Sequence, residues 1–266
     1  RTTPTTVHTN LGGTPALLAG GLYHSCAVLD SGATKCWGYN NNGQLGDGSS
    51  TNRYTPTTVD SSLGGTPVLL AVGDYHSCAV LDSAAIRCWG RNTLGQLGDG
   101  STTVSYVPTA VSWASAPPPP PAPPQVPPGQ GTLMQAGTQF GCAAVGGVTK
   151  CWGSSIYGQL GDGSATDRAT PTAVDASLGN TSVLLATGVG YHTCAVLETG
   201  ATKCWGRNNY GQLGDGSTTD RATPTSVDAS LGGTPVLLAA GEYHTCAVLD
   251  SGVTKCWGYN GYGQLG

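Results

Sequence analysis

Short apolar stretches alternate with turns rich in Gly, Asp and Ser along most of the chain, and the same pattern returns five times. In the last copy, residues alternate between the two faces of a β-strand through His244–Leu249 and again through Val253–Trp257. The turn Asp250–Gly252 separates these two stretches. Because no stretch shows the 3.6-residue period of an amphipathic helix, the pattern predicts an all-β fold.

The turn of the last copy sets the pairing register of its two strands. In a three-residue loop at Asp250–Gly252, the glycine takes the left-handed conformation that closes such hairpins. Cys246 then faces Cys256 on the opposite strand. Directly opposed residues lie about 4.5–5.5 Å apart at Cα, which is within reach of a disulfide.

The third copy has a shorter turn but keeps its cysteines opposed. Its turn is the two-residue Gly146-Gly147, and Cys142 still faces Cys151. This conserved opposition within the chain favours bonded pairs over free buried thiols or zinc ligands, which usually lie two to four residues apart and come in fours. The predicted disulfides are Cys26–Cys36, Cys78–Cys88, Cys142–Cys151, Cys194–Cys204 and Cys246–Cys256.

The repeat is long, and its sequence is distinctive. Equivalent cysteines lie 52 residues apart, except that Cys78 and Cys142 lie 64 apart. Strand-rich periods of this length are typical of propeller blades. The shared pattern G-x-Y-H-[ST]-C-A-V-L-[DE]-x-G-x-x-K-C-W-G-x-N-x-x-G-Q-L-G-D-G resembles the regulator of chromosome condensation repeat over nearly the whole chain.

That resemblance implies a β-propeller with four-stranded blades. The chain departs from the family in carrying paired cysteines at strand positions that are usually apolar, and in having five repeats where the family typically has seven blades. We therefore expect an all-β, regulator-of-chromosome-condensation-type β-propeller, or an open propeller-like stack of five four-stranded blades.

One tryptophan follows the second cysteine of every repeat. Successive residues of a strand point to opposite faces, so these indoles point away from the disulfides and are expected to pack between blades. The residues are Trp37, Trp89, Trp152, Trp205 and Trp257. Family members that sense ultraviolet-B light use clustered tryptophans in Gly-Trp-Arg-His-Thr motifs; the motif is absent here, which excludes that function.

A proline-rich insertion, residues 115–129, separates repeats one and two (1–114) from repeats three to five (130–266). Contiguous prolines fix φ and lack the N–H of a β ladder, so we expect a polyproline II rod. One interpretation is a semi-rigid linker. The other follows from similarity to the hydroxyproline-rich segments of plant and green-algal extracellular glycoproteins, which implies hydroxylation and O-glycosylation. The prolines concerned are Pro117, Pro118, Pro119, Pro120, Pro121, Pro123 and Pro124.

Composition narrows the cellular setting. Charged residues make up only 10% of the chain and the net charge is -4, which argues against a nucleic-acid surface.

Ten cysteines, all in repeat pairs, point to an oxidising compartment, so we expect an extracellular, cell-surface or secreted protein. No apolar run approaches the roughly 18 residues of a membrane span. We expect a leader to have been removed or to lie outside the sequence, which begins at Arg1. Asn180-Thr181-Ser182 is an N-glycosylation acceptor, expected in a surface loop.

Recurring polar residues offer little for catalysis. Histidines recur at one position (His24, His76, His192 and His244), where a metal ring is conceivable, but hydrogen bonds between strands of the same blade are favoured. Aspartates recur in Gly-Asp-Gly loops, where turn chemistry is favoured over calcium binding. Arg168 and Arg221 are expected to form local charge pairs near Asp167 and Asp220. With no nucleophile–base arrangement or phosphate loop, we expect no enzyme activity, no metal and no cofactor.

Three functions are considered. The first is an extracellular, non-enzymatic structural glycoprotein, a subunit of a surface filament, appendage or wall assembly. Its copies would associate head to tail, the Arg1 end with the Gly266 end, because Arg1–Val7 matches Arg221–Val227 in mid-repeat. Closure of a ring within one molecule is the alternative arrangement. The second function is a secreted propeller module that binds a protein or glycan. The third, and the least favoured, is nucleotide exchange on a small GTPase, because that partner lies in reducing compartments.

Overall fold

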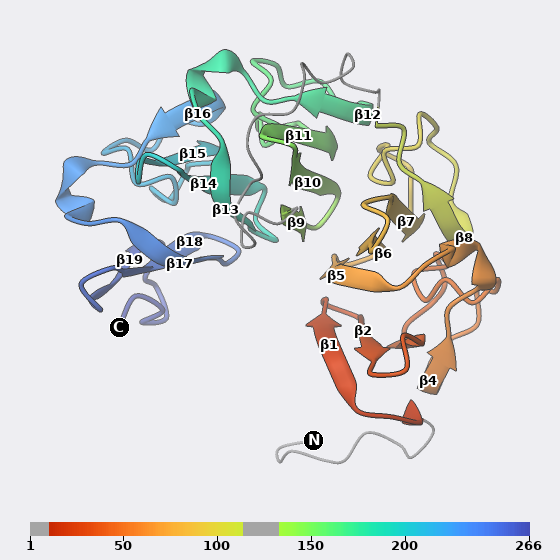
Figure 1. The fold of residues 1–266 in the computed structure, drawn as a ribbon. Coiled ribbons are helices and arrows are strands. Elements are labelled where there is room, and N and C mark those ends of the chain that lie inside the picture. Colours follow the sequence, from red (N-terminus) through yellow and green to blue (C-terminus); the bar gives the residue numbers. More distant parts are fainter. Residues whose placement is uncertain (1–10, 114–132) are drawn as a thin grey trace, which may run out of the picture.

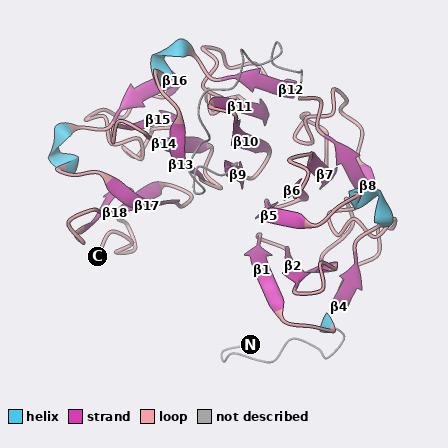
Figure 2. Cartoon of the chain, viewed as in Figure 1, coloured by secondary structure: helices cyan, strands magenta, loops and turns pink. Residues whose placement is uncertain are grey.

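The computed structural model describes residues 11–113 and 133–266, and their strands form five separate antiparallel sheets. Each sheet is one blade, and the blades follow one another along an arc (Figure 1). Figure 2 shows that strands and loops dominate, with only short helical turns. The all-β, propeller-like architecture expected from the sequence is confirmed.

Within a blade the strands follow chain order from the inside of the arc to the outside. Blade one contains β1 (Pro15–Gly20), β2 (His24–Leu29), β3 (Thr34–Gly38) and β4 (Arg53–Thr58); blade two β5 (Pro67–Val72), β6 (His76–Leu81), β7 (Ile86–Gly90) and β8 (Ser105–Ala110); blade three β9 (Leu133–Ala136), β10 (Phe140–Val145), β11 (Val148–Gly153) and β12 (Arg168–Ala173); blade four β13 (Ser182–Thr187), β14 (His192–Leu197), β15 (Thr202–Gly206) and β16 (Arg221–Ser226); blade five β17 (Pro235–Ala240), β18 (His244–Leu249) and β19 (Thr254–Gly258). Short 3₁₀ helices precede three inner strands: η2 (Ser61–Leu63), η3 (Ala176–Leu178) and η4 (Ala229–Leu231).

The inner strands hold the arc together. β1 contacts β5, β5 contacts β9, β9 contacts β13, and β13 contacts β17. Blades two and three are therefore in contact although the proline-rich residues 115–129 separate them in sequence; those residues lie outside the described ranges. Blade one and blade five lie at the two ends of the arc (Figure 1). Blade five has three strands in the described range, where four were expected.

The hairpins have the register expected from their turns. Cys246 pairs with Cys256 and Val248 with Thr254, and Gly252 closes the turn with a φ of 81°. In blade three, Cys142 pairs with Cys151 across the two-residue turn, whose glycines also have positive φ. Blade two is the exception in composition, because Ala84 occupies the left-handed position with a φ of 63°.

Replacing Ala84 with glycine is expected to raise the free energy of unfolding by about 1 kcal/mol, because an L residue in the left-handed region is strained by about that amount. Denaturation in urea measures the change. The matched control is Gly252→Ala in blade five, where an added Cβ meets nothing within 4 Å and only the backbone conformation counts. The two variants should change the free energy of unfolding by similar amounts in opposite directions. Changes of the same sign would contradict the proposed backbone strain at this position.

Every junction between blades seats a tryptophan of one blade on the disulfide of the preceding blade. Trp152 lies in one buried cluster with Cys78 and Cys88, and Trp205 lies in another with Cys142 and Cys151. Trp89 and Trp257 are placed in the same way against blades one and four. Of the five tryptophans expected to pack between blades, these four lie at such a junction, and the partly exposed Trp37 lies on the outer face of blade one.

The Gly-Gln-Leu-Gly segment of the preceding blade completes each junction. Its leucine is fully buried at Leu45, Leu97, Leu160 and Leu213. Its second glycine faces the indole so closely that a Cβ on Gly46 would lie 2.7 Å from the Trp89 indole nitrogen. The backbone carbonyl of the glutamine accepts a hydrogen bond from the indole N–H. The motif is therefore the socket for the tryptophan of the next blade.

Candidate interaction surfaces

Two of the four junctions have the same hydrogen-bonding arrangement, built from three side chains and the backbone carbonyl of a glutamine. Between blades one and two, the indole N–H of Trp89 and the hydroxyl of Ser77 both donate to the Gln44 carbonyl, each at 2.9 Å. The Ser77 oxygen in turn accepts from His24 Nε2 at 2.6 Å, because its own proton is committed to Gln44. Blades four and five repeat the arrangement, with His192 Nε2 lying 2.9 Å from Thr245 Oγ1.

His24 and His192 therefore each bridge two blades, whereas the sequence predicted bonds within one blade. The hydroxyl within hydrogen-bonding distance of each of these imidazoles belongs to the next blade, Ser77 for His24 and Thr245 for His192. Burial, together with a smaller effect of the neighbouring His76 and His244, respectively, lowers the pKa of His24 and of His192 to about 3. The imidazoles are neutral hydrogen-bonding links.

His76 lacks this link. Blade three has Gly141 where the other junctions supply a serine or threonine hydroxyl, and neither ring nitrogen of His76 has a hydrogen-bond partner within the described residues. Burial alone lowers the pKa of His76 to about 4. Of the three hydrogen bonds between blades one and two, the junction between blades two and three thus keeps only the indole bond, from Trp152 to the Gln96 carbonyl. This junction joins the two blades that the proline-rich insertion, residues 115–129, separates in sequence.

Among the described residues, the outer faces of blades one and five present groups equivalent to the two halves of an inner junction. Blade one presents Trp37 and Ser25, both partly exposed. Blade five presents His244 and Gln264, also partly exposed, beside the Cys246–Cys256 disulfide. By the repeat, Trp37 and Ser25 correspond to the donors Trp257 and Thr245, and Gln264 corresponds to the acceptor Gln212. By the equivalence with the inner junctions, one face presents hydrogen-bond donors and the other an acceptor.

All five cysteine pairs predicted from sequence are bonded in the structure, with Cα–Cα distances of 4.1 Å. The described cysteines include none that is free. The disulfides of blades one to four are fully buried by the tryptophan of the next blade, while that of blade five is partly exposed. The bridges therefore belong to the junctions as well as to their own hairpins.

The aspartate loops are structural, but the arginines bind other partners than expected. Arg168 pairs with Asp162 at 2.6 Å and Arg221 with Asp215 at 2.9 Å. Asp167 and Asp220 instead accept backbone N–H groups of Ser155 and Asn208. The arginine reaches the loop aspartate because the outer strand pairs back on the strand that precedes the loop. In the part of the chain that the structure describes, no three His, Cys, Asp or Glu side chains gather in a metal-binding cluster.

A tyrosine-rich surface was not anticipated from the sequence. Tyr23 and Tyr39 come to the same edge of blade one because His24 pairs with Gly38. Their rings lie 5.9 Å apart, and Tyr75 of blade two lies 5.1 Å from Tyr23. A hydrogen bond with Tyr23 raises the pKa of Tyr75, and Arg91 lies over the Tyr75 ring. The sequence does contain a signal for this surface, because a tyrosine directly precedes each of the four recurrent histidines.

The same surface continues over blades three to five. The Arg207 guanidinium lies over both Tyr157 and Tyr243, at 4.9 and 5.2 Å from the ring centroids. Tyr210 and Tyr259 extend the cluster at ring distances of 4.9 to 5.1 Å. Tyrosine rings with polar tips and neighbouring arginines are typical of protein recognition surfaces.

Of the predicted modification sites, Asn180 is exposed, in the loop that precedes β13. The seven prolines from Pro117 to Pro124 lie outside the described residues. No helix among residues 11–113 and 133–266 is long and apolar enough to cross a membrane.

These features define a class of protein: a tandem-repeat β-propeller whose blades are joined by a tryptophan seated in a Gly-Gln-Leu-Gly socket. The chain belongs to the regulator of chromosome condensation (RCC1) repeat family. One model of that repeat matches residues 36–80, 151–196 and 204–248, which together exceed half of the chain. A second matches residues 17–44, 68–96, 183–212 and 236–264.

Curated relatives have diverse roles. The chain is 33% identical to the ultraviolet-B receptor UVR8 of Arabidopsis thaliana over 249 residues, which is 92% of this chain and 53% of the receptor. It is 31% identical to the E3 ubiquitin-protein ligase HERC2 of Homo sapiens over 86% of this chain, but only 5% of the ligase. The chain thus spans about half of the first relative and a small part of the second.

Solved structures share the fold. Human WBSCR16 superposes with a TM-score of 0.76 at 23% identity, covering 91% of this chain and 60% of that chain. Prp20p of Saccharomyces cerevisiae, whose binding to Gsp1p and histones its structure report describes, gives a TM-score of 0.77 at 21% identity, covering 94% of this chain and 58% of that chain. At these identities the likeness concerns the fold alone.

Proposed function

We propose that this protein is an extracellular, non-enzymatic structural glycoprotein whose copies associate head to tail in a surface filament, appendage or wall assembly. The observation that carries the proposal is the complementarity of the two outer faces. Blade five offers the acceptor half of a junction, with Gln264 and a disulfide, and blade one offers the donor half, with Trp37 and Ser25.

The inner junctions supply the expected geometry of that contact. In a second copy, the Trp37 indole would lie on the Cys246–Cys256 disulfide and donate to the Gln264 carbonyl, as Trp257 does to Gln212 at 2.9 Å. The Ser25 hydroxyl would stand between Gln264 and His244, as Thr245 stands between Gln212 and His192. Because the donor and acceptor faces differ, the contact is heterologous, and repeated association gives an open polymer when the rotation between copies does not close a ring.

Extracellular placement is supported by the five disulfides, which reducing compartments disfavour. A structural role is supported by the chain's polar groups, since the repeated histidines and aspartates are used in holding blades and loops together.

Trp37→Ala is expected to weaken self-association at least about tenfold, because a tryptophan at the centre of an interface is a typical hot spot. Sedimentation velocity over a range of concentrations measures the association, and negative-stain images show whether filaments form. The fold should be retained, because Trp37 lies at no junction between blades of the same copy.

Tyr54→Ala is the matched control. Tyr54 lies in β4 of the same blade and is 93% exposed, so its removal deletes an aromatic ring outside the proposed contact. A wild-type protein that stays monomeric at every concentration would overturn the assembly. Equal association of the Trp37 and Tyr54 variants would place the contact elsewhere and overturn the assignment of the faces.

The second candidate is a secreted module that binds a protein or glycan, and the tyrosine-rich surface with Arg91 and Arg207 favours it. The same images discriminate the two functions, because a binding module would give discrete particles. Nucleotide exchange on a small GTPase is the least favoured function, since the disulfides would be reduced where such partners reside.

A further inference from the structure

The segment that leads into β13 differs from its counterparts in two residues. Blades two and five have Gly-Thr-Pro there, beginning at Gly65 and Gly233, and blade four has Asn180-Thr181-Ser182. Both changes are needed for an N-glycosylation acceptor, because the asparagine must be followed two residues later by a hydroxyl. Asn180 is exposed, so the acceptor amide is accessible.

The neighbouring hairpin explains why glycine stands at this position in the other blades. A Cβ at Gly65 would lie 3.0 Å from a carboxylate oxygen of Asp82, and one at Gly233 equally close to Asp250. Blade four has Glu198 in place of that aspartate, and its backbone N–H still donates to the Thr181 carbonyl at 3.0 Å. The longer side chain carries its carboxylate away from the backbone, which makes room for an asparagine side chain.

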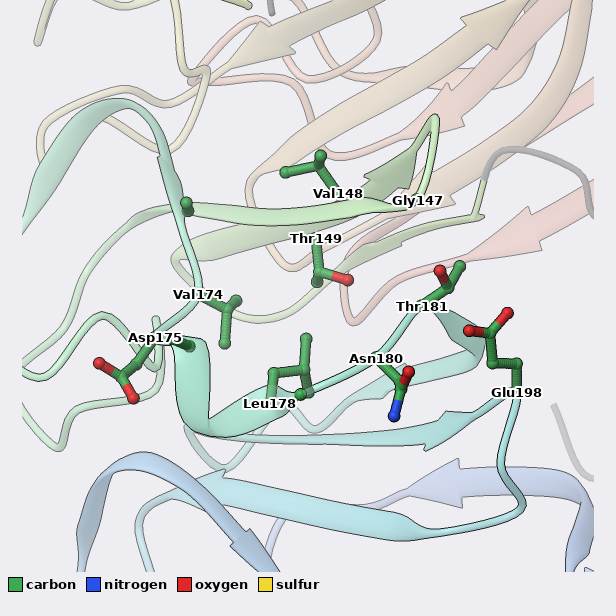
Figure 3. Close-up of a pocket in the computed structure, with 12 residues that line it drawn as sticks. Gly147, Val148, Thr149, Val174, Asp175, Leu178, Asn180, Thr181 and Glu198 are labelled. Carbon is green, nitrogen blue, oxygen red and sulfur yellow. The ribbon is translucent and has the colours of Figure 1, made fainter. Parts of the chain in front are cut away.

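A pocket of about 450 Å³ lies beside Asn180, between blades three and four. Figure 3 shows Val174 and Leu178 toward one end of this pocket and Asn180, Thr181 and Glu198 toward the other. The opposite wall is the shortened turn of blade three. An added Cβ on Gly147 lies 3.4 Å from Thr181, whereas the corresponding Gly200 of a three-residue turn lies 2.8 Å from Thr234. A Cβ on Gly32, in the three-residue turn of blade one, would lie 3.2 Å from Thr66, so the shortened turn lies slightly further from this segment than either three-residue turn.

We propose that Asn180 carries an N-linked glycan whose first N-acetylglucosamine occupies this pocket and braces blades three and four. Val174, which lines the pocket and is partly exposed, offers an apolar surface to the carbon face of the sugar. The Glu198 carboxylate and the Thr181 hydroxyl offer polar partners to its hydroxyl and acetamido groups. The covalent link keeps the effective concentration of the sugar high, so that contacts too weak to hold a free monosaccharide suffice.

The modification needs a donor that the secretory route supplies, so the inference rests on the proposed extracellular function. The donor is a lipid pyrophosphate-linked oligosaccharide. A bond forms between the asparagine Nδ2 and the anomeric carbon, the bond from that carbon to the phosphate oxygen breaks, and one amide proton leaves with the lipid pyrophosphate.

The test uses the full chain secreted from a eukaryotic host and trimmed by endoglycosidase H, which leaves one N-acetylglucosamine on Asn180. Its thermal unfolding is compared with that of Asn180→Gln. We expect the single sugar to raise the melting temperature by about 2–4 °C, the shift of a modest stabilising contact in a domain of this size. The pair is then compared again in a variant whose Gly146-Gly147 turn is replaced by Asp-Ser-Gly, the turn of the other blades. In that variant the pocket is filled, and the difference should fall below half.

Two results would overturn the inference: an Asn180 that stays unmodified in the secreted, disulfide-bonded protein, or a sugar that changes the melting temperature equally in both turn backgrounds. Both leave the head-to-tail assembly untouched. A chain that is retained inside the cell with reduced cysteines would instead overturn the proposed extracellular function.

Discussion

Replacing Cys78 and Cys88 together with alanine is expected to lower the free energy of unfolding by about 3–5 kcal/mol, at the upper end of the range for a native disulfide. The bridge closes a short loop, which accounts for about 2–3 kcal/mol through the entropy of the unfolded chain. The remainder follows from packing, because both cysteines are buried against Trp152 of the next blade and their sulfurs leave a cavity there. Guanidinium denaturation followed by tryptophan fluorescence measures the loss.

The disulfide of blade five is the matched control. Cys246 and Cys256 close a hairpin of the same length, but no tryptophan of a following blade covers them in the described chain. Replacing both with alanine should lower the free energy of unfolding of the monomeric protein by about 2–3 kcal/mol, the loop-entropy contribution alone. Full reduction of all five bridges should lower the free energy of unfolding by more than the roughly 5–15 kcal/mol that stabilises a typical domain. The reduced protein should therefore unfold. Equal losses at the two sites would contradict the packing of tryptophan on the buried bridge.

Acidification below pH 6.5 is expected to destabilise the protein steeply. His24, His76 and His192 are neutral when folded, because burial lowers their pKa values to about 3, about 4 and about 3 from 6.5. The unfolded chain binds protons at these residues below pH 6.5 and the folded chain does not, so stability is highest above that pH and falls toward pH 4. Each histidine contributes up to about 1.4 kcal/mol per pH unit in this window, or about 4 kcal/mol per unit for the three.

Urea denaturation at pH 7.5, 6.0 and 5.0 measures this dependence. His76→Phe is the control, since blade three already has Phe140 at the corresponding position, and it should reduce the slope by about a third. For Asp47, hydrogen bonds with Ser49 and Arg53 outweigh the effect of burial and lower the pKa below 3.8. The stability that this ionised carboxylate contributes is therefore lost only at a more acid pH. A flat profile between pH 7.5 and 5.0 would show that these imidazoles are not buried.

The sequence predicted the architecture and the bridges because both depend on local spacing. A turn of known length places Cys246 opposite Cys256, and alternation along a strand sends each tryptophan to the face away from its own disulfide. What it did not reveal was the neighbour across a junction. His24 was expected to bond within its blade, yet the hydroxyl it meets is that of Ser77, a full repeat later. The repeat period predicts that neighbouring blades pack together. It does not predict the offset between them, and so it does not predict which side chains meet across a junction.

The arginines illustrate the same limit at shorter range. Arg168 and Arg221 stand next to Asp167 and Asp220 in sequence, but the chain direction of the outer strand turns each guanidinium toward the loop aspartate six residues earlier. The tyrosine-rich surface was missed because its members come from three different repeat positions, and only the pairing of His24 with Gly38 shows that two of those positions meet.

Every junction points the same way along the arc: the indole always belongs to the later blade and its socket to the earlier one. In the proposed head-to-tail contact, two copies would therefore join with like orientation, and a fibre made from them would be polar along its axis. Its tips are chemically distinct, one exposing indoles and the other sockets, so elongation at the two tips should proceed at different rates.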